Sequence, residues 1–140
     1  MNSLQYKMKC KIESCLKKGT LFRKQLVETW EEAGFDKKTI FSLRLALEEA
    51  FRNAVEHGSA GNKNLLVEVT CRISSDSVEL IVKDHGKGFD YDSVDDPTKE
   101  ENLLKPNGRG IFLMKSFMDR VDFFENGRLV KMVKQVQTVN

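Results

Sequence analysis

Residues 107–119 read NGRGIFLMKSFMD, in which two glycines surround one arginine and lead directly into an apolar run. Glycine weakens helix interiors, so Gly108 and Gly110 mark a place where backbone geometry matters more than helix propensity. A glycine-rich turn that opens a helix, expected here at about 111–119, presents free backbone N–H groups and the positive end of the helix dipole. The stretch therefore predicts a binding site for an anion, and phosphate is the obvious one.

The composition around this stretch is that of one soluble globular domain covering residues 1–140. The chain is 40% hydrophobic and 31% charged, and its net charge of +2 argues against direct nucleic-acid binding. No apolar run approaches the roughly 20 residues of a membrane span, and no signal-peptide pattern follows the first methionine. Cys10, Cys15 and Cys71 form no C-x-x-C pair, which indicates a reducing compartment. We therefore expect a cytoplasmic protein without a membrane segment.

The hydrophobic periodicity predicts an alternating order of strands and helices. Residues 5–12, 65–73 and 78–82 alternate as half-buried strands, and helices are expected over 16–33 and 36–57, the second capped by Asp36. Residues 89–107 lack periodicity and are expected to form a long loop, and Asn126-Gly127 is typical of a hairpin turn. This order predicts an α/β (α+β) two-layer sandwich, with a mixed, mostly antiparallel sheet and helices on one face.

Asp84 lies at the end of a strand and shares a face with its apolar residues. A buried carboxylate is costly unless a partner satisfies it, so one interpretation is that the strand stops earlier and Asp84 caps a turn. The other is a buried acceptor for a ligand donor such as an exocyclic amine. Gly86 and Gly88 would then let a flat ring approach the backbone.

Glu49, Asn53 and His57 follow one another at four-residue spacing in LEEAFRNAVEHG, beside the inner stripe of their helix. Glu49 is suited to accept a proton, and the Asn53 carbonyl oxygen is suited to Mg²⁺. Taken alone, this row is more typical of a solvated helix face. Lys87, Lys105 and Arg109 would add positive charge near a polyphosphate, although such charges beside glycines are also common on surfaces.

The order of these motifs is more informative than any one of them. The order of the motifs resembles that of the GHKL ATP-binding superfamily, and above all of its bacterial anti-sigma factors that are serine/threonine protein kinases. The motifs are, in order, Glu-x-x-x-Asn-Ala-x-x-His, Asp-x-Gly-x-Gly, a long lid and Gly-x-Gly. The stretches LALEEAFRNAVEHG and NGRGIFLMKSFMD carry this resemblance, which covers essentially the whole chain. It implies a Bergerat-type ATP-binding fold with an ATP lid at about 89–107.

The resemblance also implies a role for each motif residue. Glu49 matches the general base, Asn53 the Mg²⁺ ligand and Asp84 the acceptor for the adenine amine. Close approach to the base is implied for the glycines of the second motif, and phosphate binding for the turn before the helix: Gly86, Gly88, Gly108, Arg109, Gly110. The implied cofactors are ATP and Mg²⁺.

The function implied is an anti-sigma factor kinase that phosphorylates a small anti-anti-sigma protein with a STAS domain, in a partner-switching system. Its partners would be that protein and a sigma factor, and the kinase itself would be a homodimer. One alternative is an ATP-binding module that sequesters a partner without phosphotransfer. Another is a stand-alone catalytic domain of the histidine-kinase type, although no phospho-acceptor helix is present and His57 and His85 are both expected inside the site.

Overall fold

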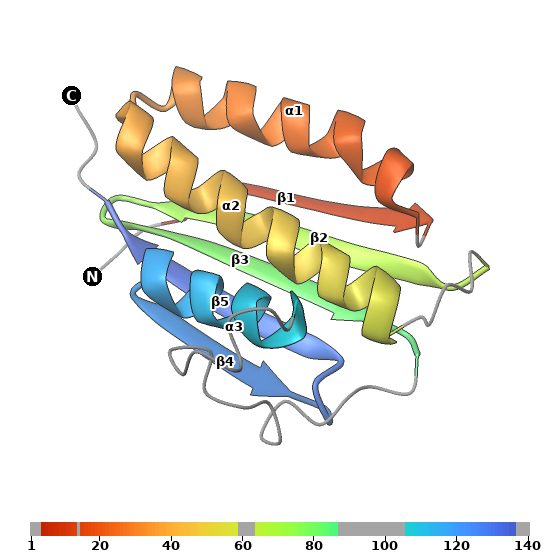
Figure 1. The fold of residues 1–140 in the computed structure, drawn as a ribbon. Helices are drawn as coiled ribbons and strands as arrows, with labels where there is room; N and C mark the ends of the chain where they lie inside the picture. Colours follow the sequence, from red (N-terminus) through yellow and green to blue (C-terminus); the bar gives the residue numbers. More distant parts are fainter. Residues whose placement is uncertain (1–3, 14, 59–63, 87–105, 137–140) are drawn as a thin grey trace.

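In a computed structural model of the chain, the structure describes residues 4–13, 15–58, 64–86 and 106–136. Within these ranges, one five-stranded sheet has the order β1-β2-β3-β5-β4, and three α-helices cover one of its faces (Figure 1). The strands are β1 (Leu4–Glu13), β2 (Leu66–Ser74), β3 (Ser77–Asp84), β4 (Arg120–Phe124) and β5 (Leu129–Gln135). The helices are α1 (Leu16–Glu32), α2 (Lys37–Asn53) and α3 (Pro106–Phe117), and a π-helical turn (Ala54–Gly58) extends α2.

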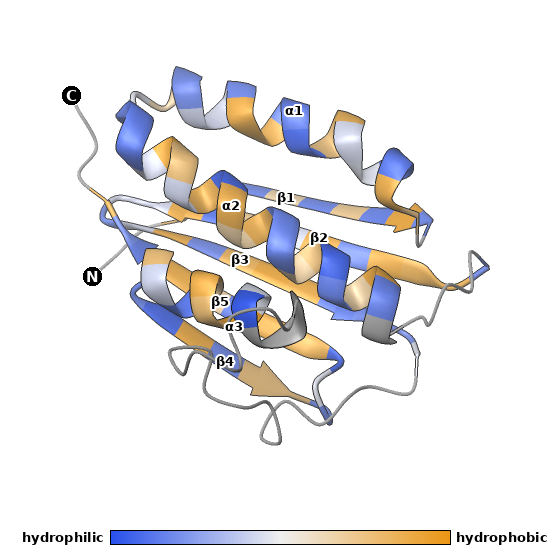
Figure 2. Ribbon diagram, in the orientation of Figure 1, coloured by the Kyte–Doolittle hydropathy of each residue, from blue (hydrophilic) through white to orange (hydrophobic). Residues whose placement is uncertain are grey.

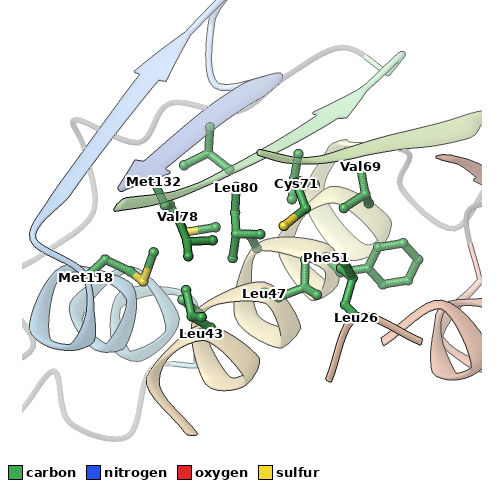
Figure 3. Close-up of a cluster of buried hydrophobic side chains, with 14 of the residues drawn as sticks. Leu26, Leu43, Leu47, Phe51, Val69, Cys71, Val78, Leu80, Met118 and Met132 are labelled. Carbon is green, nitrogen blue, oxygen red and sulfur yellow. The ribbon is translucent and has the colours of Figure 1, made fainter. Parts of the chain in front are cut away.

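The two-layer sandwich expected from the sequence is confirmed, and all four strand pairings in the described part of the chain are antiparallel. Apolar residues alternate along β2 and β3, so one face of the sheet is buried under the helices and the other carries polar side chains (Figure 2). Figure 3 shows the resulting core, in which Leu26, Leu43 and Leu47 of the helices meet Val69, Cys71 and Leu80 of the sheet.

The junction between α1 and α2 follows the local sequence signals. Gly34 ends the first helix with a φ of 85°, a left-handed conformation that favours glycine. Asp36 caps the second helix, as expected, because its Oδ1 accepts a hydrogen bond from the Thr39 N–H at 2.7 Å. Leu16, the first residue of α1, is exposed. Gly19 is buried there, where a Cβ would lie 2.6 Å from Cε1 of Phe51.

The third helix differs from the sequence expectation at both ends. It begins at Pro106 rather than near residue 111 and ends at Phe117, so Gly108, Arg109 and Gly110 lie inside its first turns. Proline suits the first helical position because its missing N–H would have no partner there. The hairpin that follows turns where expected, and positive φ angles occur at Glu125, Asn126 and Gly127. None of the described helices is long and apolar enough to cross a membrane.

Candidate functional site

The motifs singled out in the sequence converge at one end of the molecule. The last turns of α2, the first turn of α3, the end of β3 and the turn between β4 and β5 all lie there (Figure 1). The antiparallel order β3-β5-β4 places the β4–β5 turn beside the end of β3, where the N–H of Asp84 donates to the Arg128 carbonyl at 2.8 Å.

Glu49 lies on the buried side of α2, with 8% of its surface exposed. Its Oε1 accepts a hydrogen bond from Nη1 of Arg52 at 3.2 Å, in an ion pair between residues three positions apart. This pair holds the carboxylate in place and satisfies part of its charge, which a buried acid requires. The sequence analysis missed Arg52, although its spacing of three from Glu49 is the available signal.

Asn53, the last residue of α2, is 7% exposed, and its buried Nδ2 has no hydrogen-bond partner among the residues that the structure describes. Buried amides are nearly always paired, so this unpaired group is a reason to expect a ligand here. An amide oxygen next to a carboxylate is a donor set that fits Mg²⁺, which takes one or two protein oxygens and completes its shell with water and phosphate. The described residues hold no cluster of three or more acidic, His or Cys side chains that would form a closed metal cage.

Gly110 brings the third helix against these two side chains. A Cβ at this position would lie 2.8 Å from Oε2 of Glu49 and 3.8 Å from Oδ1 of Asn53. Only a residue without a side chain permits this approach of α3 to α2 while the Glu49 oxygen stays in place, whereas the distance to Asn53 is an ordinary contact. The glycine motif and the helix motif therefore form one continuous site.

The backbone around Gly108 is suited to an anion. Because α3 begins at Pro106, the N–H groups of Asn107 and Gly108 have no carbonyl partner within the helix. The positive end of the helix dipole adds to the attraction for negative charge. Arg109 follows on the same turn with an exposed side chain. These groups lie next to Glu49 and Asn53 through the Gly110 contact.

Asp84, the last residue of β3, is 2% exposed. Burial raises the pKa of its carboxyl above the ordinary value, while the Gly86 N–H, Arg128 and His85 act in the opposite direction. Oδ1 accepts the Gly86 N–H at 2.8 Å. The strand does not stop before Asp84, as the first interpretation expected, although the carboxylate does cap the turn at Gly86. Asp84 is buried, as the second interpretation requires, and its role as an acceptor for a ligand stays a prediction.

A small pocket connects Asp84 with Asn53. Helix α2, its π-helical turn, β3, α3 and the β4–β5 hairpin contribute its lining: Ala50, Asn53, Ala54, Val82, Asp84, Met114, Phe123, Gly127, Arg128, Val130. Its volume of about 10 Å³ has room for about one water molecule. A purine would therefore enter only if surrounding side chains moved outward.

Some of the predicted site residues lie outside the described ranges. These are Lys87, Gly88 and Lys105, together with the expected lid up to residue 105. His85, expected inside the site, points elsewhere, because its Nε2 lies 2.9 Å from Oε2 of Glu68, which is on the face of the sheet away from the helices. That expectation was wrong because His85 follows the buried Asp84 and the chain alternates sides at the strand end.

Comparison with known proteins shows relatives of this chain in sequence and in fold. Serine-protein kinase RsbW of Staphylococcus aureus strain JH9 is 30% identical over 126 residues, which cover 84% of this chain and 79% of the relative, and the RsbW of strain MSSA476 matches to the same extent. The crystal structure of the RsbU and RsbW domains of Rv1364c from Mycobacterium tuberculosis superposes with a TM-score of 0.60 at 17% identity, over 97% of this chain and 35% of that one. Residues 17–134 match the histidine kinase-like ATPase domain, and the chain belongs to that family.

Proposed function

We propose that this protein is an ATP-dependent serine/threonine protein kinase that acts as an anti-sigma factor in a partner-switching system. Its substrate would be a small anti-anti-sigma protein with a STAS domain, and its second partner a sigma factor. The ATPase-type family and relatives named serine-protein kinases support an ATP-using, kinase-type activity. The finer assignment extends the names of those relatives to a chain that shares 30% of their residues.

The observation that carries the proposal is the contact of Gly110 with Glu49 and Asn53. It supports placing a base, a metal ligand and a phosphate-binding helix start within one site. In the proposed reaction, bound Mg²⁺-ATP supplies the phosphoryl group that is transferred. Phosphoryl transfer depends mainly on positioning and charge neutralisation, which are the contributions that such a site makes.

Each residue of the site would then have one task. Glu49 takes the proton from the attacking hydroxyl of the substrate protein, and Arg52 holds its carboxylate toward that position. Asn53 binds Mg²⁺ through Oδ1, and Asp84 accepts the adenine amine. The remaining predicted residues approach the base or hold the phosphates under a lid at about 89–107: Gly86, Lys87, Gly88, Lys105, Gly108, Arg109, Gly110.

Transfer of labelled phosphate from ATP to a purified STAS-domain protein of the same organism tests the proposal. We expect the wild type to phosphorylate a serine or threonine, Asn53→Ala to lose metal-dependent nucleotide binding, and Glu49→Ala to bind Mg²⁺-ATP but transfer at most about 1% as fast. Unchanged transfer by Glu49→Ala would show that the base has been assigned wrongly.

The small size of the pocket at Asp84 favours a second candidate, a module that binds a partner without using nucleotide. Calorimetric titration of Mg²⁺-ATP and Mg²⁺-ADP separates the two functions. Micromolar binding that Asp84→Asn weakens supports the kinase, whereas no binding of either nucleotide leaves the binding module as the better assignment.

A further inference from the structure

An open groove lies on the helical layer where α1 ends and α2 begins. It has a volume of about 450 Å³. Its apolar lining comes from both helices and their junction: Val27, Phe35, Ile40, Phe41. The site described above is built from the other end of α2, since Phe41 and Glu49 are eight residues apart and therefore separated by about 12 Å along the helix axis.

Phe41 is the most prominent apolar group of this groove, with 47% of its surface exposed. Its ring packs edge-on against Phe117 of α3, with the ring centroids 5.7 Å apart. This contact fixes the ring of Phe41 without covering it. An orientated and exposed aromatic side chain beside an apolar hollow is the arrangement found at the centre of protein–protein contacts.

The charged side chains of the groove stand on opposite walls. Lys37 and Arg44 line it from α2, and Glu31 lines it from α1. None of these three forms an ion pair with another residue in the described part of the chain. Lys37 also stands in the first turn of α2, where the helix dipole disfavours a cation. Ion pairs within the described residues therefore give no reason for the presence of these three charges.

We propose that this groove docks an amphipathic helix of a partner protein whose apolar stripe is flanked by acidic residues. The acidic flank pairs with Lys37 and Arg44, and the apolar stripe covers Phe41. A groove between two neighbouring helices accepts a third helix through side chains spaced at i, i+3, i+4 and i+7. The proposal does not rest on phosphotransfer, and the distance from Glu49 allows docking and nucleotide binding together.

Two synthetic helical peptides with the same leucine stripe test the proposal. One carries glutamates along its flank and the other carries lysines at the same positions. Titration into ¹⁵N-labelled protein should show binding of the acidic peptide at least tenfold tighter, with shift changes centred on residues 27–44. Phe41→Ala should weaken that binding at least tenfold, while Leu21→Ala should leave it unchanged, since Leu21 is 66% exposed on α1 outside the groove.

Charge reversal provides the sharper test. The double variant Lys37→Glu/Arg44→Glu should prefer the lysine peptide, and thermal unfolding together with ATP binding would show that its fold is intact. Equal affinity for both peptides, or shift changes away from residues 27–44, would overturn the proposal. So would sedimentation showing that the free protein is a dimer that Phe41→Glu dissociates, because a second copy would then cover the groove.

Discussion

Replacing Gly110 by alanine should separate activity from stability. The new Cβ would lie 2.8 Å from Oε2 of Glu49, whereas an ordinary contact of this kind begins near 3.4 Å, so the two groups must separate by about 0.6 Å. Glu49 is buried and tied to Arg52, so this shift moves the proposed base or the start of α3. Because misplacement by about 1 Å costs about 100-fold in rate, we expect kcat to fall roughly 10- to 100-fold.

Gly110→Ala should leave the free energy of unfolding nearly unchanged or raise it slightly, although it lowers kcat. Alanine is favoured over glycine in a helix by about 1 kcal/mol, and the atom it meets is the end of a flexible side chain. Gly19→Ala is the matched control, because its Cβ would lie 2.6 Å from the ring of Phe51 in the core. We expect that variant to lose about 1–3 kcal/mol of stability.

Thermal unfolding, calorimetric titration with Mg²⁺-ATP and phosphotransfer assays measure these effects. In a Glu49→Ala background, Gly110→Ala should leave Mg²⁺-ATP binding unchanged, since the oxygen that its Cβ would meet is gone. Full phosphotransfer by Gly110→Ala would refute the reasoning. A loss of activity that merely follows a loss of folded protein would refute it equally.

Three further perturbations follow from the described contacts. Asp84→Asn removes a buried carboxyl whose pKa is raised, and the wild type therefore loses stability as the pH rises past the ordinary value of 3.8 and this carboxyl ionises. The variant should be more stable than the wild type in urea at pH 7, equally stable below pH 4, and about 10- to 100-fold weaker in ATP binding. Equal stability at pH 7 would count against a buried charge at this position. Arg52→Ala should lower kcat about tenfold with little change in ATP affinity, because the ion pair with Glu49 orients the base. Arg52→Lys should restore part of the lost kcat. A loss confined to ATP affinity would contradict this role. Burial raises the pKa of the Cys71 thiol to about 11 from 9.0, although Trp30 opposes the shift. As the pH rises, this thiol therefore ionises first in the unfolded chain, which lowers the stability of the folded protein by about 2–3 kcal/mol between pH 9 and 11. Urea unfolding should show this loss, and Cys71→Ala should show a shallower decline.

The sequence by itself determined the local elements and the order of the motifs. Alternation along residues 5–12, the Asp36 cap and the Asn126-Gly127 turn are confirmed because each depends on residues a few positions apart. The resemblance carried by the helix and glycine motifs is likewise confirmed by the family match. Periodicity and turn chemistry act within one element, so they are readable without knowing what packs against it.

Only the tertiary structure decided how these elements meet. The contact between Gly110 and Glu49 depends on the packing of α3 against α2, and the turn of β4–β5 reaches Asp84 because β5 pairs with β3. The sequence analysis did not predict the start of α3 at Pro106, because Gly108 and Gly110 disfavour a helix that packing against α2 stabilises. The role of Arg52 and the raised pKa of Asp84 depend on burial, which follows from the whole fold and not from neighbouring residues.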